Sequence, residues 1–272
     1  PAPRFVLLAG DASYDIQNNL AVENRNLLPS QIVRLRGGYA SSDSWFSLLP
    51  ESDPVPALAI GRFPAQTAEQ LQTMVEKTLA YEQNGRDLWT RRALFVSESE
   101  SFYEQFSTEL AAKLIENAYE INTLLMGQDE MVHYDLMGLL AKGVGLIHYA
   151  GDGQLSQWGD GQVFSGDDAA MLANNGHTPI FTTFTCNNGA FGDPEAHSLA
   201  EDLLRVKQGG IVASVAPSSQ ISLPALTRMG DLFYEQLLSE EAVTVGEALL
   251  NAQLAATNDP GLHEAMLVVN LL

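Results

Sequence analysis

The order of hydrophobic and polar positions along the chain predicts strands that alternate with helices. The apolar stretches are continuous rather than alternating, which is typical of strands covered on both faces, as in parallel sheets. We predict strands at 5–10, 56–63, 93–98, 143–151, 179–186 and 209–216. Each stretch is short enough for a strand and is bounded by glycine, proline or polar residues.

Helical patterns fill the intervals between these strands. The clearest begins at Thr67, where Thr67 and Gln70 form a capping-box pattern, and its apolar face continues until Gly85. Further helices are predicted at 102–118, 198–208, 224–238 and 245–257. Strands joined by helical crossovers predict a layered α/β/α sheet. The segment 11–56 is polar and irregular, and loops of that length in a compact domain often carry function.

Composition and charge narrow the classes of partner. The chain has 272 residues and 46% hydrophobic positions, enough for one large domain or two small ones. Its 14 basic and 34 acidic residues give a net charge of -20, which excludes nucleic acid and anionic lipid as favoured partners and suits basic peptides or calcium. No apolar run spans a bilayer, so we expect no membrane insertion. Both ends lie in apolar runs, and we expect an excerpt of a longer protein.

Two strand ends carry candidate chemistry. In open α/β sheets, ligand groups gather beyond the carboxyl ends of strands, and here "YAGDGQ" ends at Asp152 while "FTCNNG" contains Cys186. A cysteine followed by polar and glycine residues suits a thiol nucleophile with backbone N–H groups free for an oxyanion. The alternative is a buried cysteine that acts as a small apolar side chain. A single cysteine excludes internal disulfides.

Several segments resemble one known family. The stretch "GVGLIHYAGDGQLSQWG" resembles "NYxGHGSxxxW" of gingipain-type (C25) cysteine peptidases, and "PIFTTFTCNNGAF" resembles their "CxNGxF". The segments "AIGRFPA", "SLAEDLL", "GGIVA" and "MLVVNLL" continue the match in the same order. The resemblance implies a single caspase-like domain over 1–272, a three-layer α/β/α fold with a mostly parallel central sheet, and a Cys/His dyad that attacks peptide bonds. It also implies secretion or a cell-surface location, no required cofactor, and calcium as a structural ion.

The resemblance assigns roles to five residues. By motif position, Cys186 matches the nucleophile and Gly153 matches a residue whose backbone N–H helps to form the oxyanion hole. Trp158 matches an aromatic side chain that lines the S1 pocket. Asp53 matches the acid at the base of that pocket in arginine-specific members, and Asp43 matches a loop acid near the dyad.

The chain departs from the family at the base. Asp152 stands where the family has its histidine, and His148 stands where it has an asparagine. A carboxylate beside a thiol disfavours the thiolate, whereas an imidazole would take its proton and stabilise it. Three hypotheses follow. The chain is inactive, or His148 substitutes for the base, or Asp152 works in its protonated form.

Three functions remain open on these residues. The first is an endopeptidase that cleaves after basic (Arg/Lys) residues through Cys186. The second is a pseudo-peptidase that binds basic peptide segments without cleaving them. The third is a small-molecule α/β enzyme, although the sequence has no phosphate-binding glycine fingerprint. The oligomeric state is not determined by the sequence.

Overall fold

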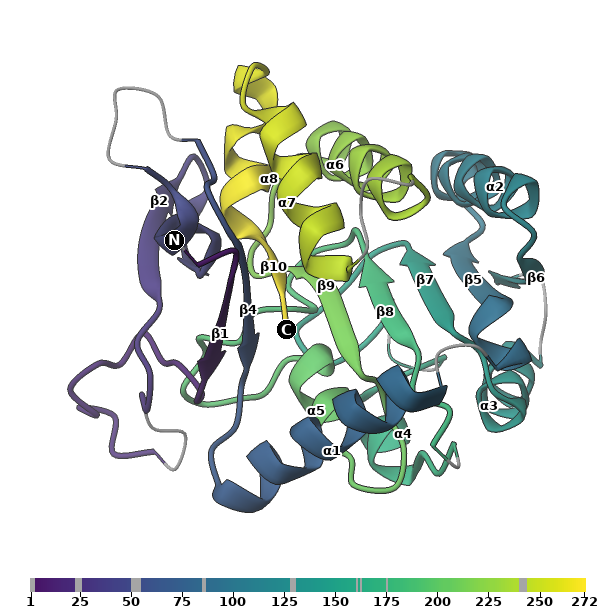
Figure 1. The fold of residues 1–272 in the computed structure, drawn as a ribbon, viewed down its shortest axis with the longest axis horizontal. Helices are drawn as coiled ribbons and strands as arrows, with labels where there is room; N and C mark the ends of the chain where they lie inside the picture. The colour runs from purple at the N-terminus through teal and green to yellow at the C-terminus, as the bar shows by residue number, and fades with distance from the viewer. Residues whose placement is uncertain are drawn as a thin grey trace.

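The fold is built on one mostly parallel sheet. The computed structural model describes residues 3–22, 26–49, 55–84, 87–127, 131–159, 161, 163–174, 176–239 and 244–272. Within them the central sheet has six strands in the order β10-β9-β8-β7-β5-β6, and only the β10–β9 pair is antiparallel (Figure 1). The strands are β5 (Arg92–Glu98), β6 (Glu120–Met126), β7 (Leu146–Ala150), β8 (Ile180–Thr183), β9 (Ala213–Pro217) and β10 (Val269–Leu271). The carboxyl ends of β5, β7, β8 and β9 therefore meet at one edge.

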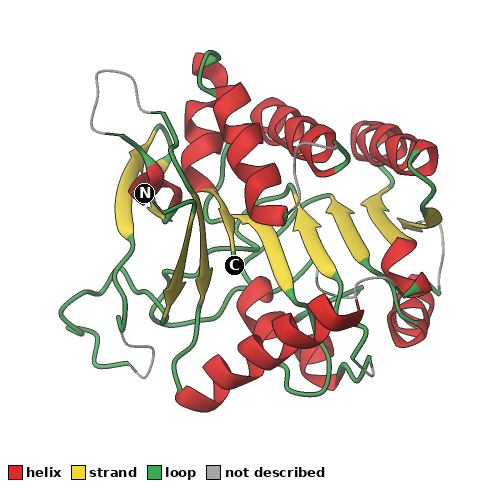
Figure 2. Ribbon diagram, viewed as in Figure 1, coloured by secondary structure: helices red, strands yellow, loops and turns green. Residues whose placement is uncertain are grey.

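Helices cover both faces of this sheet, as the three-layer prediction requires (Figure 2). One layer holds α2 (Ser101–Glu116), α6 (Leu223–Leu237), α7 (Val245–Ala256) and α8 (His263–Val268). The other holds α1 (Ala68–Asn84), α3 (Val132–Lys142), α4 (Gly166–Met171) and α5 (Leu199–Arg205). Each layer buries its own hydrophobic core against the sheet. None of the described helices combines the length and the apolar character needed to cross a membrane.

The first predicted strands do not join the central sheet. β1 (Phe5–Ala9) and β4 (Ala59–Phe63) form a separate parallel pair. The apolar pattern of β1 predicted burial on both faces, yet its Phe5 and Leu7 side chains are 49% and 56% exposed. The prediction of a fully covered strand is therefore wrong for β1, because the same pattern is compatible with a strand at the edge of the described fold.

The hairpin of β2 (Gln31–Leu35) and β3 (Gly38–Ser42) lies in the segment predicted as irregular, as does the 3-10 helix Ser44–Ser47. The hairpin strands are short and partly polar, so they contain no apolar run from which a strand could be predicted. β6 was missed because it is an edge strand whose sequence, "EINTLLM", is half exposed.

A buried guanidinium ties the β1–β4 pair to its surroundings. Arg62 on β4 is fully buried, and its Nε and Nη2 donate to the two carboxylate oxygens of Asp43 at 2.6 and 2.8 Å. Its Nη1 donates to the carbonyls of Gly10 and Leu28, and its guanidinium lies 5.1 Å from the centre of the Phe191 ring. One side chain thus holds four separate segments, and its charge is fully paired.

A second buried cation joins α1 to α5. Lys77 is 8% exposed, and its Nζ donates to the carbonyls of Leu204 at 2.6 Å, Val206 at 3.2 Å, and Leu203 and Gly209 at 3.3 Å. These carbonyls lie at and beyond the last turn of α5, where the helix end attracts positive charge, and the Leu203 carbonyl also accepts the Ile211 N–H. Burial lowers the pKa of Lys77 to about 7, while the four acceptors favour its protonated form.

We predict that Lys77→Met destabilises the fold, because four buried carbonyls lose their donor. The expected loss is about 2 to 4 kcal/mol in the free energy of unfolding, measured by urea denaturation. The matched control is Lys142→Met at an exposed position, which is expected to change stability by less than about 0.5 kcal/mol. Equal stabilities of the two variants would contradict a capping role for Lys77.

Candidate functional site

The loops after β7 and β8 lie against each other. The two strands pair in parallel, with Tyr149 opposite Thr183, so Gly151–Gly153 and Cys186 leave the sheet side by side. Thr185 Oγ1 donates to the Gly151 carbonyl across the gap. A Cβ at Gly153 would lie 2.5 Å from Thr185 Cγ2 and 2.7 Å from the Cys186 carbonyl oxygen. Only glycine fits there, so the requirement for close approach explains this residue.

Cys186 and Asp152 open into one cavity, which we call the Cys186 cleft. Its volume is about 950 Å³, and its lining includes Glu98, Glu100, His133, Asp152, Gly153, Cys186 and Gln220. No Lys or Arg contributes to this lining among the described residues. The cleft is therefore acidic, and it suits a cationic ligand better than an anion.

Glu98, at the end of β5, fixes the loop that carries Asp152. The Asp152 backbone N–H donates to Glu98 Oε2 at 3.1 Å. The Tyr149 hydroxyl lies 3.2 Å from Glu98 Oε1 and 2.8 Å from the Asp152 carbonyl oxygen. Burial raises the pKa of the Glu98 carboxyl, and the negative charge of Asp152 adds to this. Glu98 therefore positions the loop through hydrogen bonds, without a cationic partner.

The Asp152 side chain is held beside the thiol. It is exposed, and its Oδ1 accepts a hydrogen bond from the Tyr103 hydroxyl at 3.0 Å. Burial and this bond raise the pKa of Tyr103, which therefore remains a donor at neutral pH. The Asp152 carboxylate is thus held by a hydroxyl group from α2.

The environment of Cys186 favours the neutral thiol. Burial raises the pKa of Cys186, a hydrogen bond with the Gln220 side chain opposes this, and the negative charge of Asp152 raises it further. Nucleophilic attack requires the thiolate, which normally forms beside a histidine or another cation. His133, the imidazole that lines the described part of the cleft, has Nδ1 3.0 Å from the Val163 carbonyl and Nε2 3.9 Å from Asp168 Oδ1. Neither contact involves Cys186.

His148 lies in the core rather than in the cleft. Its side chain is fully buried, with Nδ1 3.3 Å from Thr182 Oγ1 and 3.1 Å from the Tyr234 hydroxyl. The rings of Phe95 and Phe106 lie 4.9 and 5.5 Å from it, and burial lowers its pKa to about 3. This position does not agree with the hypothesis that His148 replaces the missing base. His148 also precedes Asp152 by four residues, and an extended strand rises about 3.3 Å per residue, so the imidazole lies too far back along β7 to take the place of the loop residue.

Neither Trp158, expected in the S1 pocket, nor Asp43, expected near the dyad, lines the Cys186 cleft. Trp158 is 1% exposed and stacks on Tyr149 at 4.3 Å between ring centres, so it is a core residue rather than a pocket wall. Asp43 is buried and occupied by Arg62, and it does not line the Cys186 cleft. Asp53 lies outside the described residues. Gly153 lies beside Cys186, while the oxyanion role of its N–H stays a prediction.

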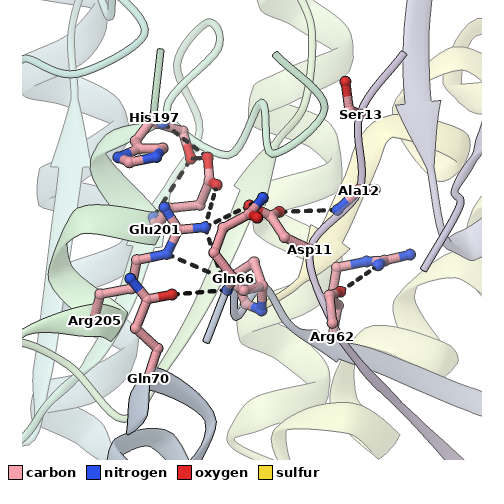
Figure 3. A network of polar contacts seen from close by, with 12 residues as sticks. Asp11, Ala12, Ser13, Arg62, Gln66, Gln70, His197, Glu201 and Arg205 are labelled. Carbon is pink, nitrogen blue, oxygen red and sulfur yellow. Dashed lines mark hydrogen bonds and ion pairs between the residues drawn. The ribbon is translucent and has the colours of Figure 1, made fainter. Parts of the chain in front are cut away.

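Asp11 and Asp15 follow β1 and could offer oxygen ligands to calcium, but their carboxylates already accept hydrogen bonds. Asp11 Oδ2 accepts from Arg205 at 2.6 Å and from Gln66 at 2.8 Å, and its Oδ1 accepts from the Ala12 N–H (Figure 3). Asp15 accepts backbone N–H groups on both oxygens. No group of three or more His, Cys, Asp or Glu side chains suited to a metal occurs among the described residues. Asp11 and Asp15 therefore do not fit a calcium site.

Glu98 and Gln220, which line the cleft, and Tyr103, which holds Asp152, were not named from the sequence. Glu98 ends a predicted strand, so the same rule that selected Asp152 would have found it. Tyr103 and Gln220 lie on a helix and in a loop, and no local pattern distinguishes them. Their importance depends on which segments pack beside β7 and β8.

The sheet, the two loops and the strand-end thiol define the caspase-like class of cysteine peptidase folds. The chain belongs to Peptidase family C25, whose sequence profile matches residues 1–272. It is 25% identical over 236 residues to gingipain R2 and to gingipain R1 of Porphyromonas gingivalis. These matches cover 79% of this chain, 31% of gingipain R2 and 23% of gingipain R1. The chain thus spans less than a third of these relatives.

Solved structures agree with this fold. The crystal structure of the Arg-specific cysteine proteinase gingipain R (RgpB) superposes with a TM-score of 0.81 at 22% identity, covering 98% of this chain and 62% of that one. Separase, in the Saccharomyces cerevisiae separase–securin complex, superposes with a TM-score of 0.56 at 12% identity over 79% of this chain and 13% of that one. At sequence identities of 22% and 12%, these two structures support a similarity of fold alone.

We predict that Asp152→Asn lowers the pKa of Cys186, because it removes a nearby negative charge without changing the shape of the side chain. The midpoint of the pH profile for alkylation by iodoacetamide is expected to fall by roughly 0.5 to 1 unit. Cys186 is the chain's one cysteine, so mass spectrometry reads this site directly. Glu116→Gln, at the opposite end of α2 from Tyr103, removes the same charge and should leave the midpoint unchanged. An unshifted midpoint in Asp152→Asn would contradict the coupling.

Proposed function

We propose that this chain is a gingipain-like peptidase domain that binds basic peptide segments at Cys186 and does not cleave them, because Asp152 occupies the position of the base. The proposal rests on the Cys186 cleft, which Cys186, Asp152 and Glu98 line together. Among the described residues, no Lys or Arg lines this cleft. Membership of a peptidase family supports a peptide as the ligand. A domain of this family that has lost catalysis can still keep the surface that binds the peptide.

The described residues of the cleft lack a group suited to the proton transfers of peptide hydrolysis. Hydrolysis needs a group that takes the thiol proton and later gives a proton to the leaving amine. An imidazole performs both proton transfers, and Asp152, whose Oδ1 accepts a hydrogen bond from Tyr103, does not supply one. His148 is sequestered in the core, and the ring nitrogens of His133 face Val163 and Asp168.

The preference for basic side chains is part of the same proposal. The protein carries a net charge of -20, and Glu98, Glu100 and Asp152 all line the cleft. Gingipain R (RgpB), an Arg-specific cysteine proteinase of the same fold, agrees with this preference. The assignment of Asp53 to the base of an S1 pocket remains a prediction from motif spacing. Secretion or a cell-surface location likewise remains a prediction from the gingipain resemblance.

The competing function is an active endopeptidase that cleaves after Arg or Lys. It shares the nucleophile position and the acidic cleft, and it differs in requiring a working base. An Asp152→His variant, which carries the residue that the resemblance predicts at this position, distinguishes the two functions.

We predict that Asp152→His gains cleavage of fluorogenic Arg and Lys peptides, because an imidazole at this position can take the Cys186 proton. The unmodified chain is expected to show no cleavage above a Cys186→Ala control. The gain in Asp152→His is expected to be at least about 100-fold over that background and to disappear in Asp152→His/Cys186→Ala.

Asp152→Asn is the matched control, because it removes the negative charge without supplying a base, and it should remain inactive. Cleavage by the unmodified chain that depends on Cys186 would show that the domain is an active peptidase. An inactive Asp152→His variant that folds normally would contradict the view that only the base is missing.

A further inference from the structure

Two carboxylates share one arginine beside helix α5. Arg205 Nη2 donates to Asp11 Oδ2 at 2.6 Å and to Glu201 Oε1 at 2.9 Å, and we call these three residues the α5 cluster (Figure 3). The exposed fractions of the three side chains are 8%, 3% and 2%. Two carboxylates thus face one positive charge in a site that is almost closed to solvent. Among the described residues, no second Lys or Arg pairs with either of them.

The other contacts of the two carboxylates are with neutral groups. Asp11 Oδ2 also accepts from Gln66 Nε2 at 2.8 Å. Glu201 Oε2 accepts from the N–H and the hydroxyl of Ser198 at 2.8 and 2.7 Å, so this carboxylate caps the start of α5. When two buried carboxylates share one cation, one of them tends to hold a proton. Burial and the charge of Asp11 raise the pKa of Glu201 to about 7, against the opposing effect of Arg205.

Other titratable groups lie beside α5. His197 Nδ1 lies 3.5 Å from Asp202 Oδ1, and this contact raises the pKa of His197. Lys77 on α1 binds carbonyls at the opposite end of the helix. Asp168 on α4 accepts from the N–H and the hydroxyl of Ser165, and β9 contains no titratable side chain. The titration of His197 is therefore the one that has to be separated from that of the α5 cluster.

The first turn of α5 lies against the two loops of the Cys186 cleft. The Leu199 N–H donates at 2.8 Å to the carbonyl of Leu155, in the loop after β7. The Ala200 N–H donates at 3.0 Å to the carbonyl of Asn188, in the loop after β8. One helical turn thus joins both loops, and the carboxylate that caps this turn belongs to the α5 cluster.

We propose that the α5 cluster is a proton-dependent clamp on the Cys186 cleft. When the carboxylate pair holds one proton, the cluster is neutral and the first turn of α5 stays closed on both loops. Loss of the proton leaves two buried carboxylates on one guanidinium, and their repulsion opens this turn. The clamp goes beyond the proposed peptide binding and does not depend on it.

The direction of the pH dependence follows from the chemistry of Glu201. An acid whose pKa is raised in the folded state contributes its full stabilisation below its unfolded pKa, here near 4.5. This stabilisation is lost as the pH rises through the folded pKa of about 7. The first turn of α5 is therefore expected to be closed in mild acid and to open more often in mild base.

The test is amide hydrogen exchange at Leu199 and Ala200, followed by NMR and expressed as protection factors, which correct for the intrinsic pH dependence of exchange. In the unmodified chain, protection of these two amides is expected to fall by at least about tenfold between about pH 5.5 and about pH 8.5, because one pKa unit corresponds to a tenfold change. Glu201→Gln keeps an acceptor for Ser198 and carries no charge, so its protection is expected to stay constant.

Asp11→Asn tests the carboxylate pair from its other side. It removes the charge beside Glu201, so the fall in protection is expected to shrink and to move to lower pH. Asp167→Asn, at an exposed position on α4, removes the same charge outside the cluster and should retain the fall. His197→Gln should retain it as well, because the imidazole is not a member of the cluster.

Constant protection in the unmodified chain, or a full fall in Glu201→Gln, would overturn the clamp. Loss of the fall in His197→Gln would assign the titration to the imidazole and would overturn it too. If Glu201→Gln does not fold, Asp11→Asn decides, and an unchanged fall in that variant contradicts the proposal. These measurements use no peptide, so their failure leaves the proposed function standing.

Discussion

The close contact between the loops after β7 and β8 is the constraint on which the functional end of this molecule depends. Parallel pairing brings the two strand ends together, and the absence of a side chain at Gly153 lets its backbone lie against Thr185 and Cys186. The hydrogen bond from Thr185 to the Gly151 carbonyl closes the same gap. Any larger residue at 153 would force the loops apart, so the geometry of the thiol and the identity of this glycine cannot be separated.

Buried cations hold the rest of the framework around that contact. Arg62 fixes Asp43 and the loop that contains Phe191, which continues from Cys186, while Lys77 anchors α1 to the end of α5. Arg205 joins Asp11 to Glu201 in the same manner. In contrast, the carboxylates at the cleft, Glu98 and Asp152, are held by hydroxyl and amide groups. The described lining of the cleft thus supplies no Lys or Arg to stabilise a thiolate, and burial together with Asp152 raises the pKa of Cys186.

Much of the fold was predictable because the strands of a covered parallel sheet have continuous apolar runs. All six predicted strands exist, although β1 and β4 form a pair of their own. The sequence selected Cys186, Asp152 and Gly153 because they follow predicted strands, and all three line one cavity, while their functional roles stay predictions. His148 and Trp158 were misplaced for a common reason: a motif gives the position of a residue along the chain but not the face on which its side chain lies. Both side chains point into aromatic clusters of the core.

The sequence by itself determined the layered α/β architecture and the family, since both depend on the order and type of residues, and it predicted that Asp152 takes the place of the family's histidine. Only the tertiary structure decided that Glu98, Tyr103 and Gln220 surround that position, and that Asp11, Arg205 and Glu201 meet in one buried cluster beside α5. These residues come from elements far apart in the chain. Their chemistry depends on burial and proximity, which arise when the loops pack together and which no local pattern encodes.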